Sequence, residues 1–221
     1  MTRLYCATGN AGKLSEFRLA AQQAGPKLEL EIEAVPGYKE ILPCDEDGDT
    51  FGRNAIIKAR HYAPHVDGFL FADDSGLVVE ALGGAPGIYS ARFAGPGATD
   101  ADNNRLLLEK LKGVQDRTAS FVCLIALMQG RRHVGIFAGR VDGIILEEPR
   151  GSAGFGYDAL FYCPQIKCTF GEATEEQKFE VSHRGQAFRS MLQRLFPPVE
   201  ITPPEPPGPK PGPWPFKKFG G

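Results

Sequence analysis

The sequence lacks several features that would place it in a common class of protein. No apolar run approaches the ~18 residues that a membrane-spanning helix needs, and the first residues reach a glycine too early for a signal peptide. The five cysteines show no paired CxxC spacing, which disfavours a zinc site or a disulfide framework. We therefore expect a soluble, cytoplasmic protein without a membrane partner.

A strong excess of charge of one sign is also missing. The 25 Lys and Arg against 27 Asp and Glu give a formal net charge of −2, so the chain has no overall basic field for a nucleic-acid backbone. We expect no nucleic-acid partner, although a local pocket for one anionic ligand stays open. The length of 221 residues, 42% of them hydrophobic, suffices for one sizeable domain or two small ones.

The composition changes abruptly at Pro197, where the chain continues as PPVEITPPEPPGPKPGPWPFKKFGG. Prolines remove backbone donors and fix φ, and the segment has too few apolar residues for a core of its own. We expect residues 198–221 to form an extended tail that is dispensable for activity. A polyproline ligand for a partner domain is the alternative.

Before the tail, strand-like and helical patterns alternate, which predicts an α/β fold with a mixed sheet. Helices are expected to begin near Gly12, Thr50, Asp100, Thr174 and Ser182. The apolar runs at 118–129 and 133–146 predict an antiparallel hairpin. Shorter strands are expected at residues 3–7, 28–35, 69–72, 77–81 and 159–163.

Three glycine-bearing or acidic stretches carry candidate chemistry. The first, Thr8-Gly9-Asn10-Ala11-Gly12-Lys13, lies between a strand and a helix, where free backbone N–H groups and the helix dipole favour an anion. The spacing GxxGK followed by Leu14 differs from the Walker A loop. A plain helix-start turn is the alternative, and we favour a phosphate site.

Acidic pairs form the second candidate. Asp45 and Glu46 belong to the loop DEDGD, and Asp73 and Asp74 follow the apolar run that begins at Phe69. We expect FADDSG (71–76) to end this strand in a small polar turn, with the two acids pointing to opposite faces. A carboxylate at a buried strand end must be paired, hydrogen-bonded or metal-bound, and Mg²⁺ prefers such hard oxygen ligands.

The third candidate combines GFGYD (154–158) with Lys178 and the stretch SHRG (182–185). A Phe between two glycines can offer its face to a base, and Lys, His and Arg can donate to keto or phosphate oxygens. A buried turn and a decorated helix start are the alternative explanation.

Together these stretches resemble the inosine/xanthosine triphosphate pyrophosphatase family. Order and separations match from about Arg3 to Phe196, and the sequence departs from the family pattern at Arg53, where Glu is usual, and at Ala159, where Pro is common. The six motifs that carry the resemblance are TGNAGK (8–13), DEDGDTF (45–51), ADDSGL (72–77), LGGAPGIYSARF (82–93), GFGYDALF (154–161) and SHRGQA (182–187).

The resemblance implies a single two-lobed domain over residues 1–197, with a mixed sheet, a central cleft and an ITPase-like, anticodon-binding/Maf-like architecture. It implies a homodimer that hydrolyses the deaminated purine nucleotides ITP, dITP and XTP to monophosphate and pyrophosphate. The expected cofactor is Mg²⁺, with Mn²⁺ as an alternative. The rival hypotheses are a phosphohydrolase that releases orthophosphate and a nucleotide-binding module without catalysis.

The resemblance also assigns roles to residues. Asp74 is the expected proton acceptor for the attacking water, Lys13 the second catalytic group, and Asp73 points away in an orienting role. The expected metal ligands are Glu46, Asp45 and Asp74. The expected substrate-binding residues are Thr8, Gly9, Asn10, Ala11, Gly12, Lys13, Ser75, Phe155, Gly156, Tyr157, Asp158, Lys178, His183 and Arg184.

Overall fold

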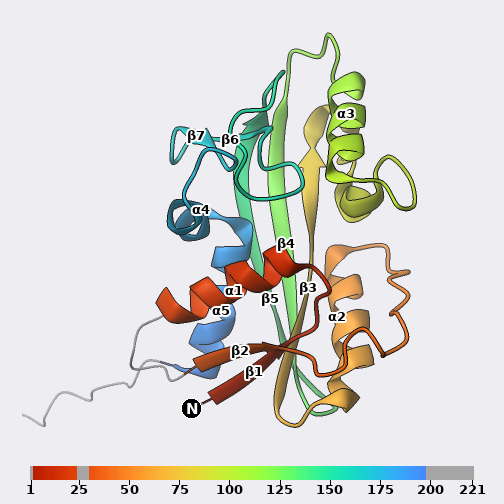
Figure 1. The fold of residues 1–221 in the computed structure, drawn as a ribbon, viewed down its shortest axis with the longest axis vertical. Helices are drawn as coiled ribbons and strands as arrows, with labels where there is room; N and C mark the ends of the chain where they lie inside the picture. Colours follow the sequence, from red (N-terminus) through yellow and green to blue (C-terminus); the bar gives the residue numbers. More distant parts are fainter. Residues whose placement is uncertain (1, 24–29, 198–221) are drawn as a thin grey trace, which may run out of the picture.

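The structure, a computed structural model, describes residues 2–23 and 30–197. Its centre is a seven-stranded mixed sheet with the strand order β2-β1-β3-β4-β5-β6-β7 (Figure 1). β1 lies parallel to β2 and β3, and all other neighbouring strands are antiparallel. The strands are β1 (Thr2–Cys6), β2 (Leu30–Ala34), β3 (Phe69–Val79), β4 (Thr118–Gln129), β5 (Arg132–Ile145), β6 (Phe161–Cys163) and β7 (Cys168–Thr169).

Helices cover both faces of one half of this sheet. On one face α1 (Ala11–Gln23) and α5 (His183–Leu195) pack around the buried rings of Phe17, Phe71 and Phe188. On the other face α2 (Phe51–Tyr62) packs against β3 and β4 through small residues such as Ala55 and Ala59. Alternate side chains of β3 therefore enter two different cores.

The long strands β3, β4 and β5 continue into a second lobe, which Figure 1 shows above the first. Its core gathers aromatic and aliphatic side chains of α3 (Asp100–Lys110), β4, β6 and the segment after β7, including Leu107, Phe121, Phe161 and Phe170. Short 3-10 turns, η2 (Glu80–Leu82) and η3 (Gly87–Arg92), connect β3 to α3. The predicted α/β mixed-sheet fold with two lobes is confirmed.

One strand differs from the prediction. The sequence FADDSG was expected to end a strand, yet β3 runs without interruption from Phe69 to Val79 and pairs with β4 along its whole length. The separate strand expected at 77–81 is the second half of this element. β1 ends at Cys6, opposite Phe71, so beyond that point no further strand of the described residues pairs with this edge of β3, although Val78 forms an isolated bridge with Pro86. The strand continues because its backbone stays paired with β4 and because Lys13 pairs with the buried carboxylate of Asp73.

The local signals at helix starts were predicted correctly. Thr50 caps α2, Thr174 and Gln177 form a capping box at α4 (Glu175–Val181), and Ser182 caps α5. The hairpin of β4 and β5 is confirmed. The predicted tail lies outside the described residues. Within the described part, none of the helices is long and apolar enough to cross a membrane.

Close contact between α5 and β5 gives a test of this packing. A Cβ at Gly139 would overlap the carbonyl oxygen of His183 and lie 2.7 Å from Ala187 N. Because both neighbours are backbone atoms of α5, Gly139→Ala should lower the free energy of unfolding by about 1–3 kcal/mol, as measured by urea denaturation.

Gly52 is the matched control, because a Cβ there meets nothing within 4 Å. Gly52→Ala lies in α2 and should leave stability unchanged or raise it by up to about 1 kcal/mol. Equal stability of Gly139→Ala and the unmodified protein would contradict the close approach of α5.

Candidate active site

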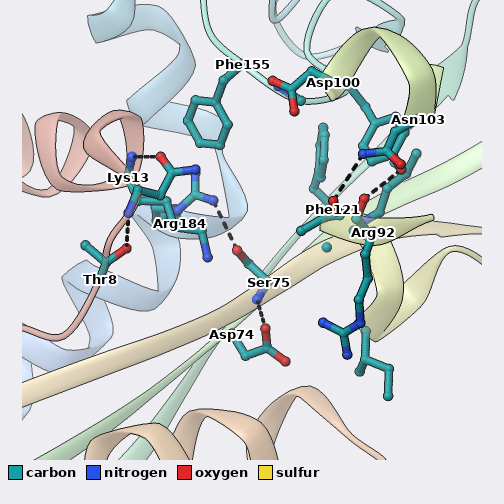
Figure 2. A pocket seen from close by; sticks show the side chains of 18 of the residues that line it. Thr8, Lys13, Asp74, Ser75, Arg92, Asp100, Asn103, Phe121, Phe155 and Arg184 are labelled. Atoms are coloured by element: carbon teal, nitrogen blue, oxygen red, sulfur yellow. Dashed lines mark hydrogen bonds between the residues drawn. The ribbon is translucent and has the colours of Figure 1, made fainter. Parts of the chain in front are cut away.

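A pocket lies between the two lobes and brings together all three candidate stretches (Figure 2). Asp74 to Leu77 of β3 form its floor. The turn before α1, the acidic loop, α2, η3, α3, the 154–158 turn and the start of α5 surround it. Predicted site residues that line it are Thr8, Gly9, Asn10, Lys13, Glu46, Asp74, Ser75, Phe155, Gly156, Tyr157, Asp158, His183 and Arg184.

The turn between β1 and α1 forms one end of the pocket. Asn10 Oδ1 accepts a hydrogen bond from Lys13 N at 3.0 Å, and Thr8 Oγ1 accepts from Asn10 N at 3.1 Å. These bonds fix the first turn of α1, where unpaired N–H groups favour an anion. Gly12 does not line the pocket, and its Cα lies against the ring of Phe155, where an added Cβ would be 2.7 Å from Phe155 Cδ1.

Asp73 lies beneath this end of the pocket and is fully buried. Its Oδ2 atom accepts hydrogen bonds from Lys13 Nζ at 2.8 Å and from Ser75 Oγ at 3.0 Å, and Arg184 Nε lies 3.9 Å away. Burial alone would raise the pKa of Asp73, but Lys13, Arg184 and Lys58 together lower it well below its usual value. The carboxylate is therefore ionised and holds three groups in place.

Asp74 points to the opposite face of β3 and into the pocket. Its Oδ1 accepts from Ser75 N at 3.1 Å, whereas Oδ2 is buried without a hydrogen-bond partner among the described residues. Burial raises the pKa of Asp74 above its usual value, and Lys58 and Lys13 offset this only in part. Such an oxygen is suited to a proton or a cation.

The acidic loop reaches the same region through Glu46. Glu46 Oε2 lies 2.9 Å from Lys58 Nζ, which also donates to the carbonyl oxygen of Asp73 at 3.0 Å. Burial would lower the pKa of Lys58, but Asp73 and Glu46 outweigh this effect, and the pKa is raised above its usual value. Lys58 is therefore charged. Asp45 is exposed and does not line the pocket.

The donors fit a hard divalent cation. Glu46 and Asp74 offer two carboxylates in one pocket, and Asp74 Oδ2 is unpartnered within the described chain. No group of three or more His, Cys, Asp or Glu able to enclose a metal occurs in residues 2–23 and 30–197. Mg²⁺ needs no such cage, because it commonly binds one or two carboxylates with substrate phosphates and water.

An aromatic ring and several cations form the other end of the pocket. Phe155 has Lys178 Nζ at 5.0 Å and Arg184 Cζ at 5.4 Å from its ring centroid. Arg184 lines the pocket and donates through Nη2 to Ser75 Oγ at 3.1 Å. Lys178 is buried beneath the ring and does not line the pocket.

The partly buried Glu16 and the buried Asp158 hold these cations. Glu16 accepts from Lys178 Nζ at 2.6 Å and from Arg184 Nη1, and Asp158 Oδ2 lies 2.5 Å from Lys178 Nζ. Burial would raise the pKa of Glu16, but Arg184 and Lys178 lower it. Burial raises the pKa of Asp158, which Lys178 offsets only in part. The charged groups are thus preorganised around Phe155.

His183 completes this end as a neutral ring. It stacks on Phe121, with centroids 4.8 Å apart and an interplanar angle of 10°. Burial lowers its pKa well below the usual value, and Arg184 and Lys178 add to the effect. Tyr157 donates its hydroxyl to the carbonyl oxygen of Ser90 at 2.9 Å and so fixes the wall of the pocket.

The sequence-based hypotheses omitted several residues of this pocket. Lys58 and Glu16 complete the two ion networks, and Arg92, Asp100 and Asn103 line the wall opposite Lys13 (Figure 2). A local signal existed for Glu16, which lies three residues after Lys13 on one side of α1. Lys58, Arg92, Asp100 and Asn103 could be assigned to a helix or a motif from the sequence, but no local pattern placed them in the pocket.

Comparison with known sequences decides the family. The sequence model of the Ham1 family matches residues 4–194. The chain belongs to the Ham1 family. This result confirms the family resemblance inferred from the six motifs.

Ham1 relatives share most of their length with this chain. It is 43% identical over 195 residues to a dITP/XTP pyrophosphatase of Exiguobacterium sp., covering 88% of this chain and 97% of the relative. It is 45% identical over 195 residues to a dITP/XTP pyrophosphatase of Desulforamulus reducens, covering 87% and 95%. The structure of a HAM1 protein from Coxiella burnetii superposes with a TM-score of 0.77 at 40% identity, covering 88% and 98%.

The buried charge of Asp73 leads to a prediction on stability and pH. Asp73→Asn should lower the free energy of unfolding by about 3–5 kcal/mol at pH 7, because Lys13 and Arg184 lose their buried partner. Since the folded-state pKa is depressed, the stabilisation is present above the unfolded pKa of about 4 and declines as the pH falls below it. The difference between the two proteins should therefore shrink from pH 5 to pH 3 in urea titrations.

Asp49 provides the control, because its ion pair with Arg53 is solvent-exposed. Asp49→Asn should change stability by less than about 1 kcal/mol across the same range. A stability difference for Asp73→Asn that stays constant from pH 7 to pH 3 would contradict the ionised, cation-bound state of Asp73.

Proposed function

We propose that this Ham1-family chain hydrolyses deaminated purine nucleoside triphosphates, ITP, dITP and XTP, to the monophosphate and pyrophosphate, and so keeps them out of DNA and RNA. The observation that carries the proposal is one pocket with a phosphate-type helix start at one end and an aromatic ring with cations at the other. Two carboxylates, Glu46 and Asp74, line the same pocket. The dITP/XTP pyrophosphatases at 43% and 45% identity support the same reaction.

The metal part of the proposal rests on Glu46 and Asp74. We propose that these two carboxylates bind Mg²⁺, with Mn²⁺ as an alternative. Asp45 is exposed outside the pocket and is not among the proposed ligands. A divalent ion bound there would acidify water and neutralise phosphate charge. Asp74 Oδ2 supports this assignment, because it is buried and has no partner in the described residues.

In the proposed reaction, water attacks the α-phosphorus and the bond to the α,β-bridging oxygen breaks. The bond's electron pair leaves with pyrophosphate, and Asp74 takes the proton of the attacking water. The Asp74 carboxylate, a weak base, would suffice for this step, because a bound divalent ion would acidify the attacking water. Lys13 Nζ and the N–H groups of Gly9, Ala11 and Gly12 are proposed to stabilise the charge on the phosphates, since the N–H groups of Thr8, Asn10 and Lys13 are bonded within the protein.

Asp73 prepares these groups without reaching the pocket. Its Oδ2 orients both Lys13 Nζ and Ser75 Oγ, so the cation is positioned before substrate arrives. Lys58, bonded to the carbonyl oxygen of Asp73 and to Glu46, keeps the acidic loop near β3. Glu46 can then turn from Lys58 towards a cation.

The other end of the pocket is proposed to select the base. The ring of Phe155 offers a stacking surface, and Arg184 and His183 line the pocket as hydrogen-bond donors. Lys178 adds positive charge beneath the ring. A 6-keto purine presents an acceptor to such donors. Adenine presents an amino group and would leave both itself and the donor unpaired, which disfavours ATP. Tyr157 and Asp158 support this end.

We also propose that the protein acts as a homodimer in the cytoplasm, as the family resemblance implies. The tail 198–221 is proposed to be dispensable for hydrolysis. A domain truncated after residue 197 would test the tail, and sedimentation would test the dimer.

The first product identifies the reaction. With ITP, dITP or XTP and Mg²⁺ the protein should release pyrophosphate and the monophosphate, and ATP and GTP should be much poorer substrates. Coupled detection of pyrophosphate and orthophosphate across this panel, with EDTA as the metal-free control, measures both points. Orthophosphate as the first product, or equal rates with ATP, would refute the proposal.

Asp74→Asn separates catalysis from binding. The amide cannot accept the proton, so kcat for ITP should fall at least about 100-fold while ITP still binds, as measured by pyrophosphate release and by calorimetry. Asp47→Asn is the control, because Asp47 is an exposed acid of the loop outside the pocket; it should retain activity. Unchanged turnover of Asp74→Asn would remove Asp74 from its role as base.

A further inference from the structure

The turn that carries Phe155 is bonded to the first turn of α3. Asp100 Oδ2 accepts a hydrogen bond from Gly156 N at 2.7 Å, and Asn104 Nδ2 donates to Gly156 O at 2.9 Å. Both backbone polar groups of Gly156 are therefore engaged by side chains of one helix. Figure 2 shows Asp100 beside Phe155 at the rim of the pocket.

The conformation of this turn needs such support. Gly156 has φ +61°, in the left-handed region that favours glycine, and Phe155 N donates to Asp158 Oδ2 at 2.8 Å. Three successive backbone groups are thus fixed by side chains from outside the strand ladder. Removal of Asp100 or Asn104 would take away one of the hydrogen bonds that hold Gly156, and the turn would become less ordered.

α3 is itself firmly anchored. Asn103 Oδ1 accepts from Ala94 N at 2.8 Å, and its Nδ2 donates to Ala91 O at 3.2 Å. Leu107 is fully buried in the core of the second lobe. The helix therefore provides a rigid support for the Phe155 turn, which a flexible loop could not do.

We propose that Asp100 and Asn104 are positioning residues that set the affinity for the purine base by holding Gly156, and through it Phe155. The inference rests on the proposed function, because it takes Phe155 as the ring on which the base stacks. Asn104 lies outside the pocket, and Asp100, which lines its wall, is proposed to act through its bond to Gly156.

This arrangement affects binding more than chemistry. Phe155 lies beside Lys178 and Arg184, at the base end of the pocket, whereas Asp74 lies on the floor among the phosphate-binding groups. A loosened turn must be ordered again when the base binds, and that ordering cost reduces affinity. The phosphate-binding side chains Lys13 and Ser75 keep their hydrogen bonds to Asp73.

The test uses Asp100→Ala and Asn104→Ala in the full-length protein. Each loses one hydrogen bond to Gly156, so KM for ITP should rise about 3- to 10-fold with kcat within about two-fold of the unmodified protein. Inorganic pyrophosphate is a product without a base, so its inhibition constant should change less than KM for ITP does, because it senses the Phe155 turn only through the contact of Phe155 with Gly12. Asp100→Asn keeps an acceptor oxygen and should restore most of the affinity.

A matched control lies on the same helical turn. Asp102 bonds Thr99 in the capping box and pairs with Arg105, so Asp102→Ala weakens the start of α3 without removing a bond to Gly156. It should lower the melting temperature and leave KM for ITP unchanged. A merely structural role of Asp100 would make the two variants behave alike.

A double-variant cycle shows whether the residues act through Phe155. In a Phe155→Ala background, Asp100→Ala should raise KM no further, because the stacking ring is already gone. An unchanged KM in both single variants, an equal KM rise in Asp102→Ala, or full additivity with Phe155→Ala would each overturn the inference. If the unmodified protein releases no pyrophosphate from ITP, the proposed function fails first and the inference fails with it.

Discussion

The ionised, fully buried carboxylate of Asp73 is the constraint on which the pocket depends. A buried charge is stable only when opposite charges and donors surround it, and here Lys13, Arg184 and Lys58 do so from α1, α5 and α2. Three helices that are far apart in sequence are thereby tied to one point on β3. β1 ends close to this point, opposite Phe71, so the edge of β3 at Asp73 has no neighbouring strand among the described residues.

Adjacent positions on β3 give two aspartates opposite properties. Asp73 enters the region of cations and its pKa is lowered, whereas Asp74 is desolvated with less compensation and its pKa is raised. Successive side chains of a strand point to opposite faces, so one residue step is enough to separate a structural anion from a chemically available one. The strand must stay regular at these residues for this separation to hold.

Local features of the fold could be predicted from the sequence, and long-range ones could not. The helix starts at Thr50, Thr174 and Ser182 follow from capping chemistry, which depends on residues three apart. The uninterrupted β3 was not predicted because it depends on pairing with β4, about fifty residues later in the sequence. The residues next to Asp73 carry no local signal of that pairing. Charged residues in the middle of an apolar run resemble a strand end until their counterions are known.

The same distinction applies to the site. Thr8, Asn10, Lys13, Asp74, Ser75 and Phe155 were predicted because they belong to short recognisable motifs, and they all line one pocket. Lys58 could not be found from its spacing, since a lysine on a helix is usually solvated. Its location at Glu46 and at the backbone of Asp73 is a property of the packed α2, not of the motif.

The contact between Gly12 and Phe155 has a thermodynamic consequence. The helix start that faces the triphosphate and the ring that faces the base touch without a side chain between them, so a shift of either moves the other. Coupling between two ligand-binding regions is reciprocal. Recognition of the base and recognition of the phosphates are therefore coupled. A nucleotide that binds well to only one of the two regions also loses part of the binding free energy at the other.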